Sequence, residues 1–256
     1  MARASLLALL LLLLLPSLTG CSVFLEGASL DEKRASLLAH PEHTLGGSSP
    51  RTYVRERIAL LVQGTFLPDG AFAIESNGTA VAVSADGYFL TAGHCVEGDR
   101  PLFLAPAPLI AFDAEALLPA RVVWRAPDCD LALVHAPLRS AAYVQDWPRA
   151  PRAGAAVLVG GFPGKAYAVL SAGAVLEVRH CACEGAVVEV HHDAPVRRGD
   201  SGGPVFDAEG VFLGINVEGI YHWPWLELTA KALLPDAESL QARIEADRWV
   251  AWRRLR

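Results

Sequence analysis

The stretch GDSGGP, residues 199–204, is the most informative part of this sequence. It places one hydroxyl, on Ser201, among glycines that keep other side chains away from the surrounding backbone. A serine hydroxyl is a weak nucleophile at neutral pH, so it reacts only with help from a nearby base. A reactive Ser201 therefore requires that the chain also supply an imidazole and a carboxylate.

Two earlier stretches supply these groups. The stretch LTAGHC, residues 90–95, carries His94, and DCDLALV, residues 128–134, carries Asp130. Each lies at the edge of a short apolar run that is typical of a strand. A histidine can take the serine proton, and a carboxylate can fix the imidazole tautomer and stabilise the imidazolium. Together the three stretches predict a nucleophilic triad.

The chain order of these residues resembles that of the trypsin-like serine endopeptidases, whose triad also runs His, Asp, Ser. Within that family the chain is most similar to the Do-like (HtrA) branch. The likeness extends over residues 52–235 and is carried by motifs at residues 79–91, 120–125, 160–164, 171–175, 193–194 and 214–216. Do-like proteins usually continue into PDZ domains, and we expect none in this chain.

The resemblance implies an all-β fold of two six-stranded antiparallel β-barrels of the chymotrypsin type with a C-terminal helix. The residue pattern agrees, because short β-branched runs alternate with Gly, Pro, Asp and Asn, as in sandwiches and barrels. Asp236 could cap a helix that packs through Leu240 and Ile244. A second interpretation of this helix has Trp249, Trp252 and the terminal arginines touching a membrane.

The resemblance also implies the role of each site residue. Ser201 is the nucleophile that forms an acyl-enzyme, His94 is its general base, and Asp130 orients the imidazole. The backbone N–H groups of Gly199 and Ser201 converge on the substrate oxygen as an oxyanion hole. We expect no metal ion and no cofactor in this chemistry.

The substrate pocket is implied at Pro195, Val217, Glu218 and Gly219. Trypsin has its acidic residue at the position of Pro195, so a preference for Lys or Arg is not expected. Glu218 is the one acidic residue nearby, either solvated or favouring a basic substrate residue. We expect a small or medium apolar side chain at the cleaved position.

The family often frees a new N-terminus that pairs with the residue at position 200. No clear activation signature precedes the protease region in this chain, so we expect no zymogen step. The carboxylate of Asp200 is then expected to pair with Arg197 or Arg198.

The N-terminus is typical of a bacterial lipoprotein. Arg3 precedes an apolar run at residues 6–15, which is too short to span a bilayer, and the small residues before Cys21 resemble a lipobox. We expect a signal peptide at residues 1–20, a lipidated tether at 21–50 that begins with acylated Cys21, a protease domain at 51–235 split near residue 145, and a helix at 236–256. Ser22 after the cysteine resembles the outer-membrane sorting pattern.

The composition limits the partners. The 256 residues are 52% hydrophobic and carry a net charge of −6, which excludes a disordered chain and argues against nucleic acid as a partner. We expect polypeptide substrates, anchoring to the bacterial cell envelope through the N-terminal lipid, and a protease domain in the periplasm. The alternative is a catalytically silent lipoprotein that keeps the fold as a peptide- or protein-binding module. The oligomeric state cannot be inferred.

Four cysteines would remain after lipidation of Cys21, namely Cys95, Cys129, Cys181 and Cys183. They allow three pairings, and a Cys95–Cys129 bridge is one option because each is a chain neighbour of a predicted triad residue. A competing interpretation is a zinc site, whose ligands would be taken from His180, Cys181, Cys183, His191, His192 and Asp193.

Overall fold

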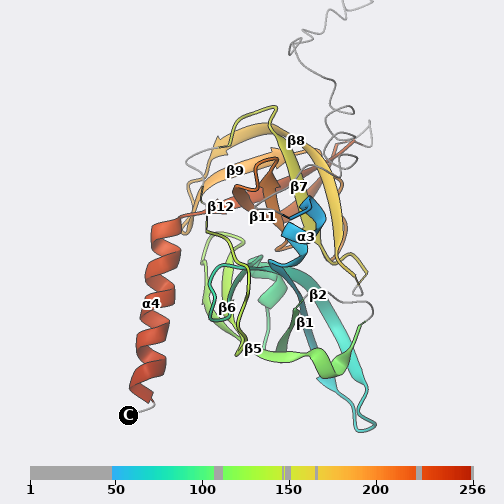
Figure 1. The fold of residues 1–256 in the computed structure, drawn as a ribbon, viewed down its shortest axis with the longest axis vertical. Coiled ribbons are helices and arrows are strands. Elements are labelled where there is room, and N and C mark those ends of the chain that lie inside the picture. The colour runs from blue at the N-terminus through green and yellow to red at the C-terminus, as the bar shows by residue number, and fades with distance from the viewer. Residues whose placement is uncertain are drawn as a thin grey trace, which may run out of the picture.

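The structure is a computed structural model that describes residues 48–106, 112–145, 147, 151–164, 167–222 and 227–254. The predicted signal peptide, Cys21 and nearly all of the predicted tether lie outside these residues. The described chain forms two β-barrels, one above the other, with a long helix beside them (Figure 1).

The first barrel is built entirely from antiparallel pairs. It closes in the order β1-β2-β3-β6-β5-β4. Its strands are β1 (Ile58–Phe66), β2 (Phe72–Ala82), β3 (Tyr88–Thr91), β4 (Leu102–Pro106), β5 (Leu118–Arg125) and β6 (Ala132–His135). Two single 3-10 turns interrupt it, η1 (Gly93–Val96) after β3 and η2 (Ala114–Ala116) before β5.

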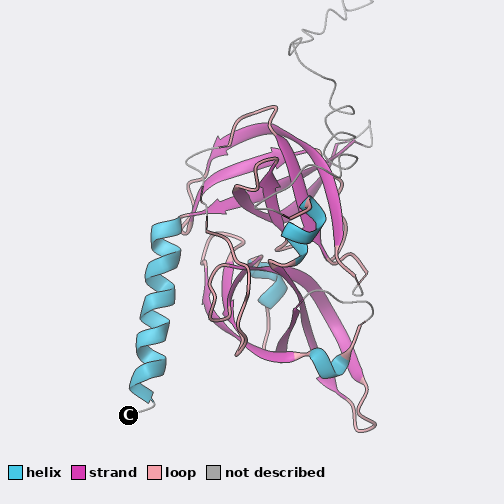
Figure 2. Cartoon of the chain, viewed as in Figure 1, coloured by secondary structure: helices cyan, strands magenta, loops and turns pink. Residues whose placement is uncertain are grey.

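The second barrel repeats this design. It closes in the order β10-β11-β12-β9-β8-β7. Its strands are β7 (Ala156–Gly161), β8 (Val169–His180), β9 (Ala186–His192), β10 (Pro204–Asp207), β11 (Phe212–His222) and β12 (Glu227–Pro235). The predicted fold of two six-stranded antiparallel barrels is therefore confirmed (Figure 2).

Helices lie at both ends of the described chain. The short α3 (Pro50–Arg55) precedes β1, and its Tyr53 hydroxyl donates a 2.9 Å hydrogen bond to the Gly210 carbonyl of the second barrel. The long α4 (Ala237–Arg254) follows β12, and Leu240 and Ile244 are buried in agreement with the predicted packing. Among the described helices, none combines the length and the apolar character needed to cross a bilayer.

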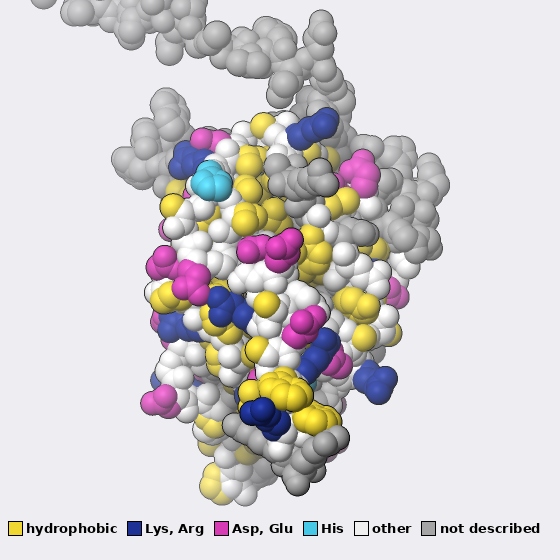
Figure 3. All heavy atoms as spheres, turned by 90° about the vertical axis from the view of Figure 1, so that its left-hand side faces the viewer, with side chains coloured by type: hydrophobic (Ala, Val, Ile, Leu, Met, Phe, Trp, Pro, Cys, Tyr) yellow, Lys and Arg dark blue, Asp and Glu magenta, His cyan; other side chains and the backbone are white. Residues whose placement is uncertain are grey.

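The face that carries α4 is mixed in character. Acidic, basic and hydrophobic side chains are interspersed over it (Figure 3). Near the C-terminus of α4, Trp249 and Trp252 stack with ring centroids 5.1 Å apart, and both remain substantially exposed.

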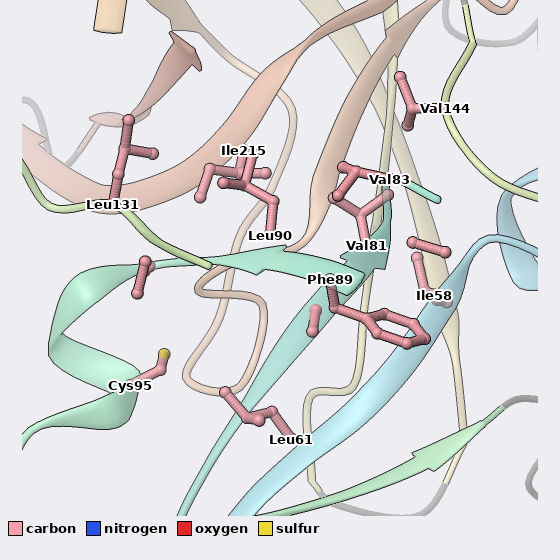
Figure 4. Close-up of a cluster of buried hydrophobic side chains, with 14 of the residues drawn as sticks. Ile58, Leu61, Val81, Val83, Phe89, Leu90, Cys95, Leu131, Val144 and Ile215 are labelled. Carbon is pink, nitrogen blue, oxygen red and sulfur yellow. The ribbon is translucent and has the colours of Figure 1, made fainter. Parts of the chain in front are cut away.

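The cores of the two barrels are continuous. Ile215 of β11 in the second barrel packs with Leu90 of β3 and with Leu131 just before β6, both from the first barrel (Figure 4). All three side chains are completely buried. Because protein interiors are close-packed, this shared apolar contact fixes how the edges of the two barrels meet.

Candidate active site

His94 and Asp130 lie at one edge of the first barrel. Strands β3 and β6 pair with Thr91 opposite Ala132, so the segments beyond these residues emerge side by side. The backbone N–H of His94 donates to Asp130 Oδ1 at 2.7 Å, and the ring Nδ1 lies 2.7 Å from Asp130 Oδ2. Both carboxylate oxygens therefore hold the same histidine, by its backbone and by its ring.

The glycine before His94 makes this approach possible. A Cβ atom at Gly93 would lie 3.1 Å from Asp130 Oδ1 and 3.2 Å from the Leu131 nitrogen. Both distances are shorter than most real Cβ contacts. A side chain at position 93 would therefore require the Asp130 carboxylate or the Leu131 backbone to shift. Gly93 thus leaves the space in which Asp130 packs against the backbone of His94.

The pair perturbs the pKa of both partners. The hydrogen bond that the His94 ring makes to Asp130, followed by its hydrogen bond with Cys95, raises the pKa of His94 above its ordinary 6.5. Burial acts to raise the pKa of Asp130, but its hydrogen bonds with His94 outweigh burial and lower it. A negative Asp130 therefore stabilises a proton on the His94 ring.

Ser201 faces this pair from the second barrel. Its carbonyl accepts a 2.8 Å hydrogen bond from the Thr79 N–H, and Cys95 Sγ lies 3.8 Å from the same carbonyl oxygen. Ser201 thus lies against η1, the turn that carries His94. Among the contacts of the described residues, the Ser201 hydroxyl makes no hydrogen bond to the His94 ring.

The loop before Ser201 leaves two N–H groups unused. Gly199 has φ of +101°, a conformation that L side chains rarely adopt, and a Cβ there would lie 2.4 Å from the Phe162 carbonyl. Within the described chain, neither Gly199 nor Ser201 donates its backbone N–H to a protein acceptor. The loop is held instead by the intervening and following amides, since Asp200 N–H bonds Arg197 O and Gly202 N–H bonds Asn216 O.

Thr79 links this loop to the first barrel, and the sequence analysis missed it. It lies on β2, completely buried. Its hydroxyl donates to the Gly199 carbonyl at 2.7 Å and accepts from the Phe162 N–H at 3.0 Å. One side chain therefore satisfies two backbone groups of the second barrel and fixes the position of the Gly199 peptide relative to the first barrel.

Asp200 differs from the expected arginine pair. Its carboxylate accepts a 2.8 Å hydrogen bond from the backbone N–H of Arg197, and the described ion pairs include no guanidinium partner for it. Burial raises its pKa from 3.8 to about 6, against the lowering effect of the Arg197 N–H. The turn of the loop brings the Arg197 amide, rather than its side chain, onto the carboxylate.

A cavity of about 300 Å³ opens beside Ser201. Its described lining comprises Val196, Arg197, Arg198, Asp200, Ser201, Asn216, Glu218 and Gly219. Of the four predicted pocket residues, Glu218 and Gly219 line the cavity, whereas Pro195 is exposed and Val217 is buried, and neither is part of that lining. Glu218 forms a 2.8 Å ion pair with Lys231.

A buried polar pair supports one wall of the cavity. His192 of β9 is completely buried, and burial lowers its pKa to about 4. Its Nε2 lies 2.8 Å from Asn216 Oδ1, so a neutral imidazole donates to the amide oxygen. The Asn216 amide nitrogen has no protein partner in the described chain. The sequence analysis does not identify this pair, because both residues lie on strands whose register only the fold defines.

The cysteines pair differently from the option raised on the sequence. The disulfide joins Cys129 to Cys183, and Cys95 and Cys181 are free. A Cys95–Cys129 bridge is therefore wrong: Cys95 points toward the Ser201 carbonyl, whereas Cys129 points into the second barrel. The imidazoles of the zinc interpretation do not join the sulfurs, since within the described chain the only ligand group that gathers here is Cys129, Cys181 and Cys183.

Comparison with known proteins agrees with this geometry. The family model for a trypsin-like peptidase domain matches residues 78–215, so the chain belongs to the trypsin-like peptidase family. The predicted likeness to the HtrA branch is confirmed. The chain is 30% identical, over 149 residues, to a probable periplasmic DegP-like serine endoprotease of Hahella chejuensis (strain KCTC 2396). That match covers 56% of this chain but only 29% of the relative.

Two solved structures share the fold. The serine endoprotease from Yersinia pestis is 20% identical to this chain, with a TM-score of 0.58. The match covers 77% of this chain and 65% of the Yersinia pestis chain. The active form of the Rv3671c protease from M. tuberculosis is also 20% identical with a TM-score of 0.58, covering 76% of this chain and 82% of its own. At this identity, both show the two-barrel architecture alone.

Proposed function

We propose that this chain is a serine endopeptidase that hydrolyses peptide bonds through an acyl-enzyme on Ser201. The observation that carries the proposal is the His94–Asp130 pair, with two contacts of 2.7 Å, beside a serine-bearing loop with unused N–H groups. Asp130 keeps the proton on Nδ1, which leaves the Nε2 lone pair of His94 available to a serine hydroxyl.

Acylation would proceed in two proton transfers. Ser201 Oγ attacks the carbonyl carbon of the substrate while His94 Nε2 takes the hydroxyl proton. The N–H groups of Gly199 and Ser201 donate to the negative oxygen of the tetrahedral intermediate. The C–N bond then breaks as His94 gives its proton to the leaving amine. Water repeats the sequence on the ester, which releases the acid and restores Ser201.

The proposal requires a hydrogen bond between the Ser201 hydroxyl and His94 Nε2 when substrate binds. Only the Ser201 hydroxyl lacks its hydrogen bond, and catalytic hydrogen bonds are often long or poorly aligned until substrate binds. A rotation about the Ser201 Cα–Cβ bond is a fast rearrangement of a single group.

An active-site phosphonate probe tests the activity directly. We expect the wild-type chain to form a covalent adduct on Ser201, and Ser201→Ala to form none. His94→Ala keeps the hydroxyl but removes its base, so labelling should slow by more than about a thousand-fold. If folded wild-type protein binds peptides but never forms the adduct, the catalytically silent binding module is the correct function.

The cellular context is proposed from the N-terminal sequence. We propose that Cys21 is acylated and tethers the domain to a bacterial membrane, with the outer membrane favoured and polypeptide substrates met in the periplasm. Labelling with a radioactive fatty acid and fractionation of the envelope would test this. Cys21→Ala should lose both the label and the membrane association, while Cys95→Ala should keep both.

A further inference from the structure

Three sulfur atoms gather beside the segment that carries Asp130. Cys129, Cys181 and Cys183 have all their Sγ atoms within 4.8 Å of one another. Cys129 and Cys183 are joined as a disulfide, and the free Sγ of Cys181 lies 2.7 Å from that of Cys183. A free thiol therefore touches a disulfide sulfur, which is the arrangement from which thiol–disulfide exchange begins.

The disulfide connects the two barrels at the candidate active site. Cys129 lies between β5 and β6 and is the residue directly before Asp130. Cys183 lies 54 residues later, in the turn between β8 and β9 of the second barrel. The same covalent bond thus holds the barrels together and anchors the segment that presents the Asp130 carboxylate.

Noncovalent contacts surround the disulfide and would remain without it. The Glu184 N–H donates to Asp128 Oδ1 at 2.9 Å, and Gly185 packs against the Trp124 ring. Arg243 of α4 lies over the same ring and pairs with Glu184 at 2.7 Å. Breaking the covalent bond therefore leaves the barrels associated but frees the Asp130 segment to shift.

We propose that Cys129, Cys181 and Cys183 form a thiol–disulfide exchange site with two alternative bridges. Cys181 gives its thiol proton to solvent base, and the thiolate attacks Cys183 Sγ. The Cys181–Cys183 bond forms, the Cys129–Cys183 bond breaks, and Cys129 leaves as a thiolate that takes up a proton. No electrons are gained or lost, so neither an oxidant nor a reductant is consumed.

Position decides which sulfur is attacked. Cys181 Sγ is in contact with Cys183 Sγ, and both residues lie in the same short turn, so their bridge needs no movement of the barrels. The product bridge lies wholly within the second barrel and leaves Cys129 as a free thiol in the first. External thiols or dithiols would act on the same site by reducing either bridge.

The exchange would regulate the protease, and this part rests on the proposed function. With the inter-barrel bridge in place, the Asp130 segment is fixed and His94 keeps its orientation. With the bridge moved to Cys181–Cys183, we expect acylation of Ser201 by the phosphonate probe to slow about ten-fold. The structure thus places a covalent switch one residue from the group that orients the base.

Disulfide mapping tests the exchange independently of activity. Purified protein is held at mildly alkaline pH without added oxidant, quenched in acid, alkylated with N-ethylmaleimide and digested with trypsin. Cys129 falls in the peptide 126–139, and both Cys181 and Cys183 fall in the peptide 180–197. We expect cross-linked peptides from one state, and from the other an internally bridged 180–197 with alkylated Cys129.

Variants separate the parts of the proposal. Cys181→Ser should give only the cross-linked pair, whereas Cys95→Ser, which also removes a free buried thiol, should give both patterns. Cys129→Ser mimics the opened state, so its probe labelling should be about ten-fold slower than that of Cys181→Ser. Should Cys129→Ser fail to fold, the wild-type pattern still decides whether exchange occurs.

Three results would overturn the exchange site. The first is wild-type protein that gives only the cross-linked pair at mildly alkaline pH. The second is Cys181→Ser that opens the bridge without added thiol, and the third is purified protein that binds stoichiometric zinc through three unbridged thiols. A chain that exchanges its bridges but never reacts with the probe would instead contradict the proposed protease function.

Discussion

The two barrels hold their shares of the active site in different ways. The first barrel fixes His94 through two direct contacts with Asp130, set by the pairing of neighbouring strands β3 and β6. The second barrel presents Ser201 on a loop held by backbone hydrogen bonds and by one hydroxyl, that of Thr79, from the other barrel. The acid–base pair is thus a local property of one barrel, while the alignment of the nucleophile is a property of the interface.

The largest effect is expected from the first barrel. In Asp130→Asn the His94 N–H still selects the oxygen, so the amide NH₂ faces Nδ1 and imposes the wrong tautomer. We expect kcat to fall by about ten thousand-fold, as for the equivalent change in a known triad. The steady-state hydrolysis of a peptide ester, where residual rates are measurable, would check it.

We also expect Asp130→Asn to shift the pH profile of kcat/KM. Activity needs neutral His94, so kcat/KM rises as pH increases through the pKa of this histidine. Asp130 raises that pKa above 6.5, and its replacement should move the midpoint to lower pH. A midpoint that stays in place while the rate falls would show that Asp130 does not control the charge of His94.

The next largest effect on the rate is expected at the interface between the two barrels, where Thr79 holds the loop that carries Ser201. Thr79→Val keeps the shape of the side chain but leaves the Gly199 carbonyl and the Phe162 N–H without their partner. We expect kcat to fall about 10- to 100-fold with little change in KM, because a displaced oxyanion donor acts on the transition state. Thr79→Ser, which keeps the hydroxyl, should recover most of the rate. If both variants behaved alike, packing rather than the hydrogen bonds would position the loop.

A smaller effect, on stability rather than rate, is expected from Asp200. Its pKa rises from 3.8 unfolded to about 6 folded, so the protonated form is favoured in the native state. Its contribution to stability is complete below pH 3.8 and is lost as pH rises through 6, by roughly 3 kcal/mol. The free energy of unfolding of wild type relative to Asp200→Asn should decline by about that amount between pH 3 and pH 7. Urea unfolding at several pH values measures it, and a constant difference would contradict the burial argument.

The smallest effect is expected at the edge of the cavity. Lys231 already neutralises Glu218, whose side chain is 55% exposed. Glu218→Gln should therefore change the ratio of kcat/KM between peptides with Arg and Leu at the cleaved position by less than about three-fold. Lys231→Met leaves the carboxylate unpaired and should favour Arg more strongly. A large loss of Arg cleavage in Glu218→Gln would show that the carboxylate binds substrate directly.

The sequence predicts the first barrel's part of the site better than the interface. His94 and Asp130 stand beside short apolar strands that pair directly, so a local pattern identifies them. Thr79 and Asn216 act through backbone groups or side chains on other strands, and nothing in their own neighbourhood distinguishes them from ordinary strand residues. Long-range register, rather than local preference, creates their roles.

The disulfide pairing could not be predicted from the sequence for the same reason. Proximity in sequence to the triad suggested Cys95 with Cys129, but the carboxylate of Asp130 turns toward His94 while the adjacent Cys129 turns the other way. Alternate residues of an extended segment point to opposite sides, so neighbours of two touching residues need not touch. The partner of Cys129 is therefore set by where the second barrel brings its β8–β9 turn.

The position of α4 has a mechanical consequence. Arg243 holds the second barrel through Glu184, while Arg121 and Asp86 of the first barrel pair with Asp247 and Arg248. The helix thus forms ion pairs with both barrels from neighbouring turns in its interior, and relative rotation of the barrels would strain these ion pairs. Because these ion pairs are partly exposed to water, their attraction weakens as ionic strength rises. We therefore expect the two barrels to rotate against each other more easily at high salt concentration.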